Sequence, residues 1–298
     1  MELRHLRHFV AVAEELSFTR AAERLHIGQP PLSQSIQALE ADVGAQLFER
    51  TRRWVRLTEA GRLFLEDAYR ILALTASASQ NAKRAEKGEV GDLRLGFNNS
   101  MPLTAHFATT INAYRNRFPE VTLHLSEMST MQQIEAIRER RLDLGYIRPP
   151  EVQIPDDILL TPVQLHPLMV ITPSNHRLAG RKKISLKELE NEHFVTFLKN
   201  QGTTLYPQIQ RLCGTAGFTP KIVMEVREAA TMMGLVAAGC GITILPNMFA
   251  CINITNISHA VLSDAGASTG LILAYRSGEV SPLVNSFISI AMTHKDIM

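Results

Sequence analysis

A long uninterrupted helical pattern divides this chain into two parts. Between Thr58 and Lys87 there is no proline, and the single glycine, Gly61, stands close to the start. Small and apolar residues recur there at near-heptad spacing, which predicts one helix of about 28 residues, roughly 42 Å long. Such a helix cannot bury its apolar stripe alone. It either lies on its own domain or pairs with a second copy in a coiled coil, and its length and alanine-rich seam favour the pair.

The residues before this helix carry the pattern of a small helical unit. Apolar spacing predicts a first helix over 3–16, and Ser17 is a suitable N-cap for a second. A third helix is expected to start at the prolines after Gly28 and to end at Gly44. Two short strands with a basic tip follow over 47–57. The order helix, helix, turn, helix, wing predicts a winged helix-turn-helix.

The third helix and the wing carry side chains suited to DNA. In a helix-turn-helix the second helix of the motif enters the major groove, with its first residues against base edges. The candidates for these contacts are Pro30, Pro31, Ser33, Gln34 and Gln37. The wing adds Arg50, Arg52 and Arg53, which suit phosphates or a minor groove. The alternative is a three-helix domain with a solvated polar face, because this geometry also occurs in proteins that bind no DNA.

Beyond a hinge at 88–92 the pattern changes to strands that alternate with helices. The apolar strand candidates are 93–97, 121–127, 142–147, 168–172, 194–197, 222–226, 242–245 and 271–275, and helical runs fall at 103–118, 131–140, 205–213 and 229–238. This alternation is typical of a parallel α/β architecture.

Polar residues follow several of these strands, where α/β lobes bind ligands. They are Asn98, Asn99, Ser100, Ser129, Thr130, Arg148, Lys199, Thr203 and Thr204. Hydroxyls, amides and cations at such positions suit a small anion. The alternative for any single serine or threonine is a plain helix N-cap, which is the commoner role.

Charge and composition restrict the partners and the location. Lys plus Arg number 31 and Asp plus Glu 29, a net charge of +2, so any affinity for nucleic acid must be local. No signal peptide and no apolar run long enough to span a membrane is visible, which predicts a cytoplasmic protein without a membrane partner. Three cysteines, Cys213, Cys240 and Cys251, fit neither a disulfide framework nor a metal motif, and we expect no cofactor.

The stretch PPLSQSIQALEADVGAQLFERTRRWVRLTEAG resembles the DNA-binding signature of LysR-type transcriptional regulators, and MELRHLRHFVAVAEELSFTRAAERLHIGQPPLSQSI continues the match back to Met1. The resemblance covers essentially the whole chain. It implies an α/β protein with a winged helix-turn-helix over 1–58, a dimerising linker helix over 59–87 and a two-lobed, periplasmic-binding-protein-like effector domain over 88–298. The lobes would comprise about 93–163 with 268–298, and 164–267. It also places Gln29 at the DNA. Many members have arginine where this chain has Gln34, so the base preference there does not carry over.

Within that family the chain looks most like the branch responsive to aromatic acids and their ring-cleavage products. The similarity lies in SEMST, in EVREAATMMGLVAAGCGITILP and in the positions Ser100 and Thr130. It implies a small carboxylate or aromatic effector between the lobes, at Asn99, Ser100, Met101, Thr130, Arg148, Phe197, Lys199, Thr203 and Thr204. Members of the branch differ among themselves around the segment FLKNQGTT.

The resemblance also implies the partners and a mechanism. The partners are double-stranded promoter or operator DNA with an interrupted palindrome, the small effector, and further copies of the chain in a dimer or a tetramer. We expect the effector to close the lobes about crossing strands near 162–167 and 266, and thereby to change DNA affinity or bending.

Two other classes of function stay open at this point. An enzyme on a similar fold is the first, although the chain has no GxSxG elbow between a strand and a helix and no GxxxxGK[ST] or HExxH motif, and His5 and His8 lack further metal ligands. A redox sensor is the second. Cys213 and Cys240 lie in apolar helical patterns typical of inert thiols, whereas the setting of Cys251 is undecided.

Overall fold

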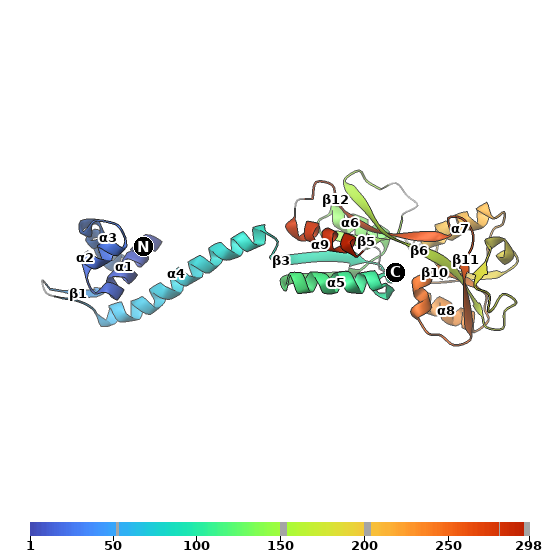
Figure 1. The fold of residues 1–298 in the computed structure, drawn as a ribbon, viewed down its shortest axis with the longest axis horizontal. Helices are drawn as coiled ribbons and strands as arrows, with labels where there is room; N and C mark the ends of the chain where they lie inside the picture. Colours follow the sequence, from blue (N-terminus) through green and yellow to red (C-terminus); the bar gives the residue numbers. More distant parts are fainter. Residues whose placement is uncertain (52–53, 150–153, 200–203, 280, 295–298) are drawn as a thin grey trace. The chain divides into compact units, whose positions relative to one another are not determined.

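The computed structural model describes residues 1–298 except 52–53, 150–153, 200–203, 280 and 295–298. The chain forms two compact units, Met1–Ala85 and Glu86–Met298 (Figure 1). In the described part of the chain, no helix is long and apolar enough to cross a membrane.

The first unit has the expected order of elements. These are α1 (Leu3–Glu15), α2 (Phe18–Arg24), α3 (Gln29–Val43), the antiparallel pair β1 (Phe48–Arg50) and β2 (Val55–Leu57), and α4 (Glu59–Glu86). The Ser17 side chain caps α2 by accepting a hydrogen bond from the backbone N–H of Arg20. Gly44 ends α3 with a left-handed backbone, φ 74°. These local signals explain why the helices begin and end where the sequence predicts.

The start of α4 packs on the core of this unit. Phe9 lies 5.2 Å from both Phe48 and Phe64, ring centroid to ring centroid, so that α1, the wing and α4 share one aromatic cluster. Ala68 is fully buried there, whereas Leu74, further along α4, is 71% exposed. The beginning of this helix therefore lies on its own domain, which is one of the two alternatives, whereas Leu74 further along is left exposed.

Gly61 of α4 lies against the wing and leaves no room for a side chain. A Cβ atom at Gly61 would lie 2.0 Å from the carbonyl oxygen of Leu47, which is backbone and cannot move aside cheaply. We expect Gly61→Ala to lower the free energy of unfolding of this unit by about 2–3 kcal/mol. The fluorescence of Trp54, the sole tryptophan, reports this during denaturant titration.

Gly234→Ala is the matched control for that substitution. Gly234 lies within α8 (Ala229–Ala237), and nothing stands within 4 Å of a Cβ added there. Alanine should therefore stabilise that helix by about 0.5–1 kcal/mol, measured by circular dichroism. Equal effects of the two substitutions would show that the contact at Gly61 yields without cost.

The second unit begins with a lobe built on parallel strands. Its elements are β3 (Val90–Phe97), β4 (Glu120–Glu127), β5 (Leu144–Ile147), α5 (Ala105–Arg117), α6 (Thr130–Arg138), α9 (Pro282–Thr293) and the 3-10 helix η1 (Met101–Leu103). Leu144 and Tyr146 pack with α5 and α9, whereas the next residue, Ile147, packs with α6. Because alternate residues of a strand point to opposite faces, these helices cover the two faces of the sheet.

The second lobe has a hydrophobic core of its own. It contains β7 (Lys183–Ile184), the parallel pair β8 (His193–Phe197) and β9 (Lys221–Val226), β10 (Thr243–Pro246), β11 (Ile257–Leu262), α7 (Leu205–Thr215), α8, and the 3-10 helices η2 (Leu186–Leu189) and η3 (Asn247–Cys251). Leu168, Val170, Ile171 and Leu245 are fully buried in it.

One long strand passes through both lobes. The first part of β6 (Ile158–Pro173) pairs antiparallel with β12 (Ser268–Arg276), and its last residues, from Leu168 on, pair with β10 and β11. The boundary expected between 163 and 164 falls inside this strand, and the pairing changes at Pro167 and Leu168. The sheet is therefore mixed rather than wholly parallel.

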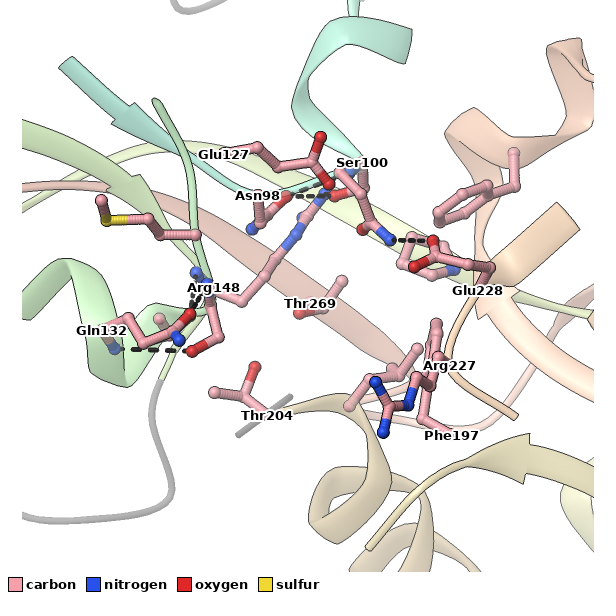
Figure 2. Close-up of a pocket in the computed structure, with 17 residues that line it drawn as sticks. Asn98, Ser100, Glu127, Gln132, Arg148, Phe197, Thr204, Arg227, Glu228 and Thr269 are labelled. Carbon is pink, nitrogen blue, oxygen red and sulfur yellow. Dashed lines mark hydrogen bonds between the residues drawn. The ribbon is translucent and has the colours of Figure 1, made fainter. Parts of the chain in front are cut away.

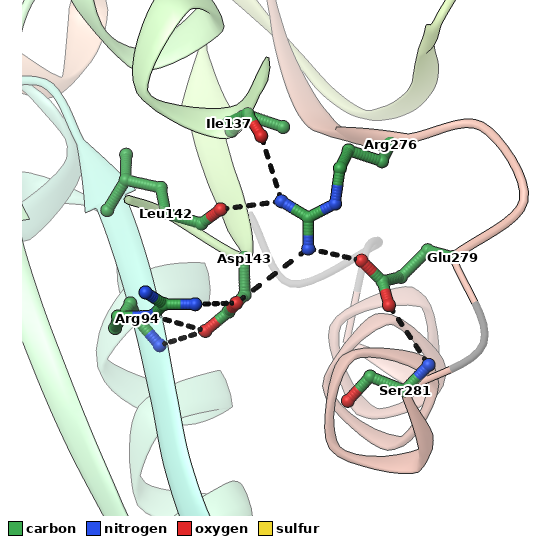
Figure 3. Close-up of polar contacts among 7 residues, drawn as sticks. All are labelled: Arg94, Ile137, Leu142, Asp143, Arg276, Glu279 and Ser281. Atoms are coloured by element: carbon green, nitrogen blue, oxygen red, sulfur yellow. Dashed lines mark hydrogen bonds and ion pairs between the residues drawn. The ribbon is translucent and has the colours of Figure 1, made fainter. Parts of the chain in front are cut away.

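A polar cluster joins three elements of the first lobe (Figure 3). The guanidinium of Arg276 donates to the carbonyl oxygens of Ile137 and Leu142, both at 2.8 Å, and forms an ion pair with Glu279. Glu279 in turn accepts from the backbone N–H of Ser281 at 3.0 Å, just before α9. One arginine thus joins the end of α6, the approach to β5 and the start of α9.

Candidate functional site

The first candidate surface lies along α3. Gln29, Pro30, Pro31, Gln34 and Gln37 are exposed, and Ser33 is half-buried. On the opposite side of the helix Leu32, Ile36 and Leu39 are fully buried. The structure thus brings the predicted DNA-contacting residues of this helix to one open side, and Gln29 also accepts a hydrogen bond from Thr19 at 3.3 Å.

The structure describes two of the arginines of the wing, Arg50 and Arg56. Arg50 forms an ion pair with Glu40 of α3, and its guanidinium lies 5.2 Å from the ring centroid of Phe18. Arg56 lies 4.9 Å above the Trp54 ring and is exposed. Arg52 and Arg53 fall outside the described residues. Among the wing arginines that the structure describes, Arg50 is therefore engaged within the domain.

A second surface lies on α4. Leu63, Ile71 and Leu74 are 56%, 36% and 71% exposed. At 100° per residue these three side chains fall within about 80° of one another around the helix. These three positions belong to the near-heptad pattern of the sequence, and the single chain leaves them exposed.

The third candidate site is a cleft in the second unit. It has a volume of about 320 Å³ and is lined by residues of both lobes (Figure 2). The residues lining it are Asn98, Asn99, Ser100, Glu127, Met128, Ser129, Thr130, Gln132, Arg148, Phe197, Thr204, Leu205, Arg227, Glu228, Pro246, Phe249 and Thr269. Most of them follow the carboxyl ends of β3, β4, β5, β8 and β9, which is where α/β folds bind ligands.

Most of the effector residues implied by the family resemblance meet in this cleft. Those that line it are Asn99, Ser100, Thr130, Arg148, Phe197 and Thr204. Met101 does not, because η1 turns it into the core of the first lobe, where it is fully buried. Lys199 is exposed and is not a lining residue, and Thr203 falls outside the described residues.

The cleft also contains residues that the sequence analysis did not single out. Arg227 and Glu228 directly follow β9, so the rule of strand ends could have found them. Phe249 lies on η3 and had no such signal. Glu228 accepts a hydrogen bond from the side-chain amide of Asn99 at 3.5 Å, which joins the two lobes across the cleft.

Arg148 is the most unusual group in the cleft. Its side chain donates to the Ser100 hydroxyl at 3.0 Å and to the Gly270 carbonyl at 3.2 Å, and the residue is only 7% exposed. No carboxylate forms an ion pair with it in the part of the chain that the structure describes. Burial lowers its pKa to about 10. A buried cation without a counter-ion is costly, so this guanidinium is poised to accept an anion.

Thr130 and His166 are polar neighbours of Arg148, and neither carries a charge at neutral pH. The Thr130 hydroxyl, in the first turn of α6, accepts from the backbone N–H of Arg148 at 3.4 Å. Burial, reinforced by the Arg148 charge, lowers the pKa of His166 to about 4, which keeps this ring neutral at pH 7. Arg148 is therefore the charged member of this group at neutral pH.

Helix capping explains some of the hydroxyls but not all. Ser129 caps α6 by accepting from the backbone N–H of Gln132 at 3.4 Å. Thr204 precedes α7 but makes no capping hydrogen bond with its side chain. Ser129 is thus a helix N-cap, whereas the Thr204 side chain does not cap its helix and lines the cleft.

The other chemistry weighed from the sequence has little support here. Burial raises the pKa of the Cys213 thiol to about 12, which disfavours the reactive thiolate. Cys240 is half-buried and Cys251 exposed, and neither forms a disulfide. Within the described ranges, no group of three or more His, Cys, Asp or Glu side chains could hold a metal ion.

Two family models match the chain. Residues 3–62 match the bacterial regulatory helix-turn-helix protein, lysR family, and residues 86–295 match the LysR substrate binding domain. The chain is 42% identical over 288 residues to the uncharacterized HTH-type transcriptional regulator YnfL of Escherichia coli strain K12, covering 96% of each chain. It is 36% identical to the HTH-type transcriptional regulator AlsR of Bacillus subtilis strain 168, covering 98% of this chain and 95% of that protein.

A solved structure extends the comparison to the fold. Full-length CbnR complexed with its target DNA has a TM-score of 0.85 and 27% sequence identity, covering 99% of this chain and 100% of that one. The matched families and relatives are transcriptional regulators rather than enzymes.

Proposed function

This chain belongs to the LysR family of DNA-binding transcriptional regulators, and we propose that a small carboxylate bound in the cleft changes how the protein holds its promoter DNA. One observation carries the ligand class: the buried Arg148 guanidinium has no carboxylate partner among the described residues. A carboxylate would supply the missing charge through short charge-assisted hydrogen bonds. Phe197, Leu205 and Phe249 offer apolar surface to the rest of an aromatic or unsaturated acid.

The DNA-binding surface consists of α3 and the wing. Gln34 and Gln37 are exposed near the start of α3 and can each present a donor and an acceptor to an adenine edge. The solved complex of CbnR with its target DNA supports this use of the fold. The DNA partner is a double-stranded promoter or operator with an interrupted palindrome, read by a pair of chains.

Self-association completes the proposal. The apolar stripe of α4 (Leu63, Ile71 and Leu74) pairs with that of a second copy, because neither chain can cover it alone. A second contact, made by the effector domain, allows two such dimers to form a tetramer.

The effector acts by changing the arrangement of the two lobes. The chain crosses between them near Pro167 in β6 and near Ala267 before β12, and Asn99 reaches Glu228 across the cleft. A ligand shifts this arrangement only if it binds one state more tightly than the other. The change in lobe arrangement then alters how the effector domains pair, and with it the bending of the DNA.

Footprints on the intergenic DNA beside the protein's own coding region test this proposal. We expect saturating benzoate or muconate to change the protected positions, with a matching change in small-angle scattering. Identical footprints and identical scattering with and without both acids would remove carboxylate control and leave a DNA-binding protein with another effector.

A further inference from the structure

One carboxylate ties the recognition helix to the wing. Glu40 lies on α3, and its side chain is only 12% exposed. Its Oε1 atom accepts hydrogen bonds from the backbone N–H groups of Leu47, at 2.9 Å, and Phe48, at 3.1 Å. Its Oε2 atom forms an ion pair with Arg50. Three groups at the start of the wing thus converge on a single side chain of α3.

The wing needs such a connection because it is too small to fix its own orientation. It has two strands of three residues, paired from Phe48 with Leu57 to Arg50 with Val55. An isolated two-stranded hairpin is marginally stable at best. Its position on the domain therefore depends on the packing of Phe48, Val55 and Leu57 against the core and on the hydrogen bonds to Glu40.

We propose that Glu40 is a positioning residue for DNA recognition, which holds the wing and α3 as one rigid reading surface. This inference rests on the proposed function of α3 and the wing in DNA binding. In this surface Arg50 contacts Glu40 and the ring of Phe18 and supports the wing rather than binding a phosphate. The spacing between base contacts and wing contacts is then set inside the protein before DNA arrives.

Simple electrostatics predicts the opposite result for a substitution at Glu40. An anion beside a DNA-binding surface repels phosphates, so its neutralisation should strengthen binding. Glu49 provides the matched control, since it is the residue next to Arg50 and is exposed. Its side chain makes no hydrogen bond or ion pair with any other residue that the structure describes. Removing either carboxylate changes the net charge of the protein by the same amount, but only Glu40 makes hydrogen bonds to the wing.

The experiment compares the full-length protein with Glu40→Gln, Glu40→Met and Glu49→Gln. Binding is measured by fluorescence anisotropy at several salt concentrations, on the intergenic DNA beside the coding region and on a scrambled duplex. Glu40→Met, which removes every acceptor, should weaken specific binding about tenfold or more and reduce the salt slope by about 1. Glu40→Gln keeps an oxygen for Leu47 and Phe48 and should fall between. Glu49→Gln should bind as tightly as the unaltered protein, or more tightly.

Two further readouts separate positioning from a loss of folding. Melting of the first unit, followed by Trp54 fluorescence, shows whether each variant is folded. If Glu40→Met is unfolded, the comparison of Glu40→Gln with Glu49→Gln tests the proposal instead. Without DNA, amide exchange at Leu47 and Phe48 should be faster in Glu40→Met than in Glu49→Gln. Hydroxyl-radical footprints should lose the wing protections and keep those of α3.

The proposal is overturned if folded Glu40 variants bind DNA as tightly as Glu49→Gln. If the unaltered protein does not distinguish the intergenic DNA from the scrambled duplex, the proposed function fails instead. In that case the order of Glu40→Gln and Glu49→Gln on any duplex still decides whether Glu40 positions the wing.

Discussion

Replacing Arg148 with methionine should remove the response to carboxylates and leave the folded protein slightly more stable. The substitution deletes the charge that would bind the anion, which should weaken binding of benzoate or muconate by about 10- to 100-fold. It also removes a buried cation that has no carboxylate partner in the described part of the chain, so the free energy of unfolding should rise by about 1 kcal/mol. Calorimetric titration and thermal unfolding measure the two effects.

Arg276→Met is the matched control for this prediction. Arg276 is also mostly buried, with 15% of its side chain exposed, but it is paired with Glu279 and two carbonyl oxygens (Figure 3). Its loss should lower the free energy of unfolding by about 3 kcal/mol and leave ligand binding unchanged in the folded protein. If Arg148→Met binds both acids normally, the anion is held elsewhere and the proposed ligand class loses its basis.

Leu74→Glu should convert the protein to monomers and weaken its binding to a palindromic site by about 100-fold or more. Leu74 is 71% exposed in the single chain and lies on the apolar stripe of α4. A carboxylate there would be buried without a partner in both copies of the coiled coil. Sedimentation velocity gives the mass of the assembly, and anisotropy on the intergenic DNA gives the affinity.

Gln80→Glu adds the same charge to the same helix, about 120° away around its axis at 100° per residue. It should leave the assembly intact. A Leu74→Glu protein of unaltered mass would show that α4 is not the dimer seam.

The helices of the first unit could be predicted because their signals are local. Ser17, Gly28 and Gly44 mark helix ends, and the apolar spacing between them matches α1, α2 and α3. The long strand β6 could not be predicted in full, because Pro162 and Pro167 interrupt its pattern. The structure accommodates Pro162 where the ladder with β12 is irregular, opposite Leu271 and Ile272. Such tolerance depends on a partner strand distant in sequence.

The cleft was only partly predictable for a similar reason. Asn99, Ser100, Thr130 and Arg148 follow strands whose ends are visible in the sequence, and the structure brings them together. Glu228 also follows a strand end, but Phe249 lies on η3 without such a signal, and only the tertiary fold brings these two residues of the second lobe opposite the first. That Arg148 has no carboxylate partner among the described residues, and that the wing is attached to Glu40, could be learned only from the structure, because both depend on contacts between distant residues.

Binding to the intergenic DNA beside the coding region, titrated with salt and repeated with Gln34→Ala, tests the central claim most directly. The account predicts tight binding with a steep salt dependence. It also predicts that Gln34→Ala loses about 1–3 kcal/mol on this site and little on a scrambled duplex. Binding that is absent, or equally weak on both duplexes, would contradict a sequence-reading regulator.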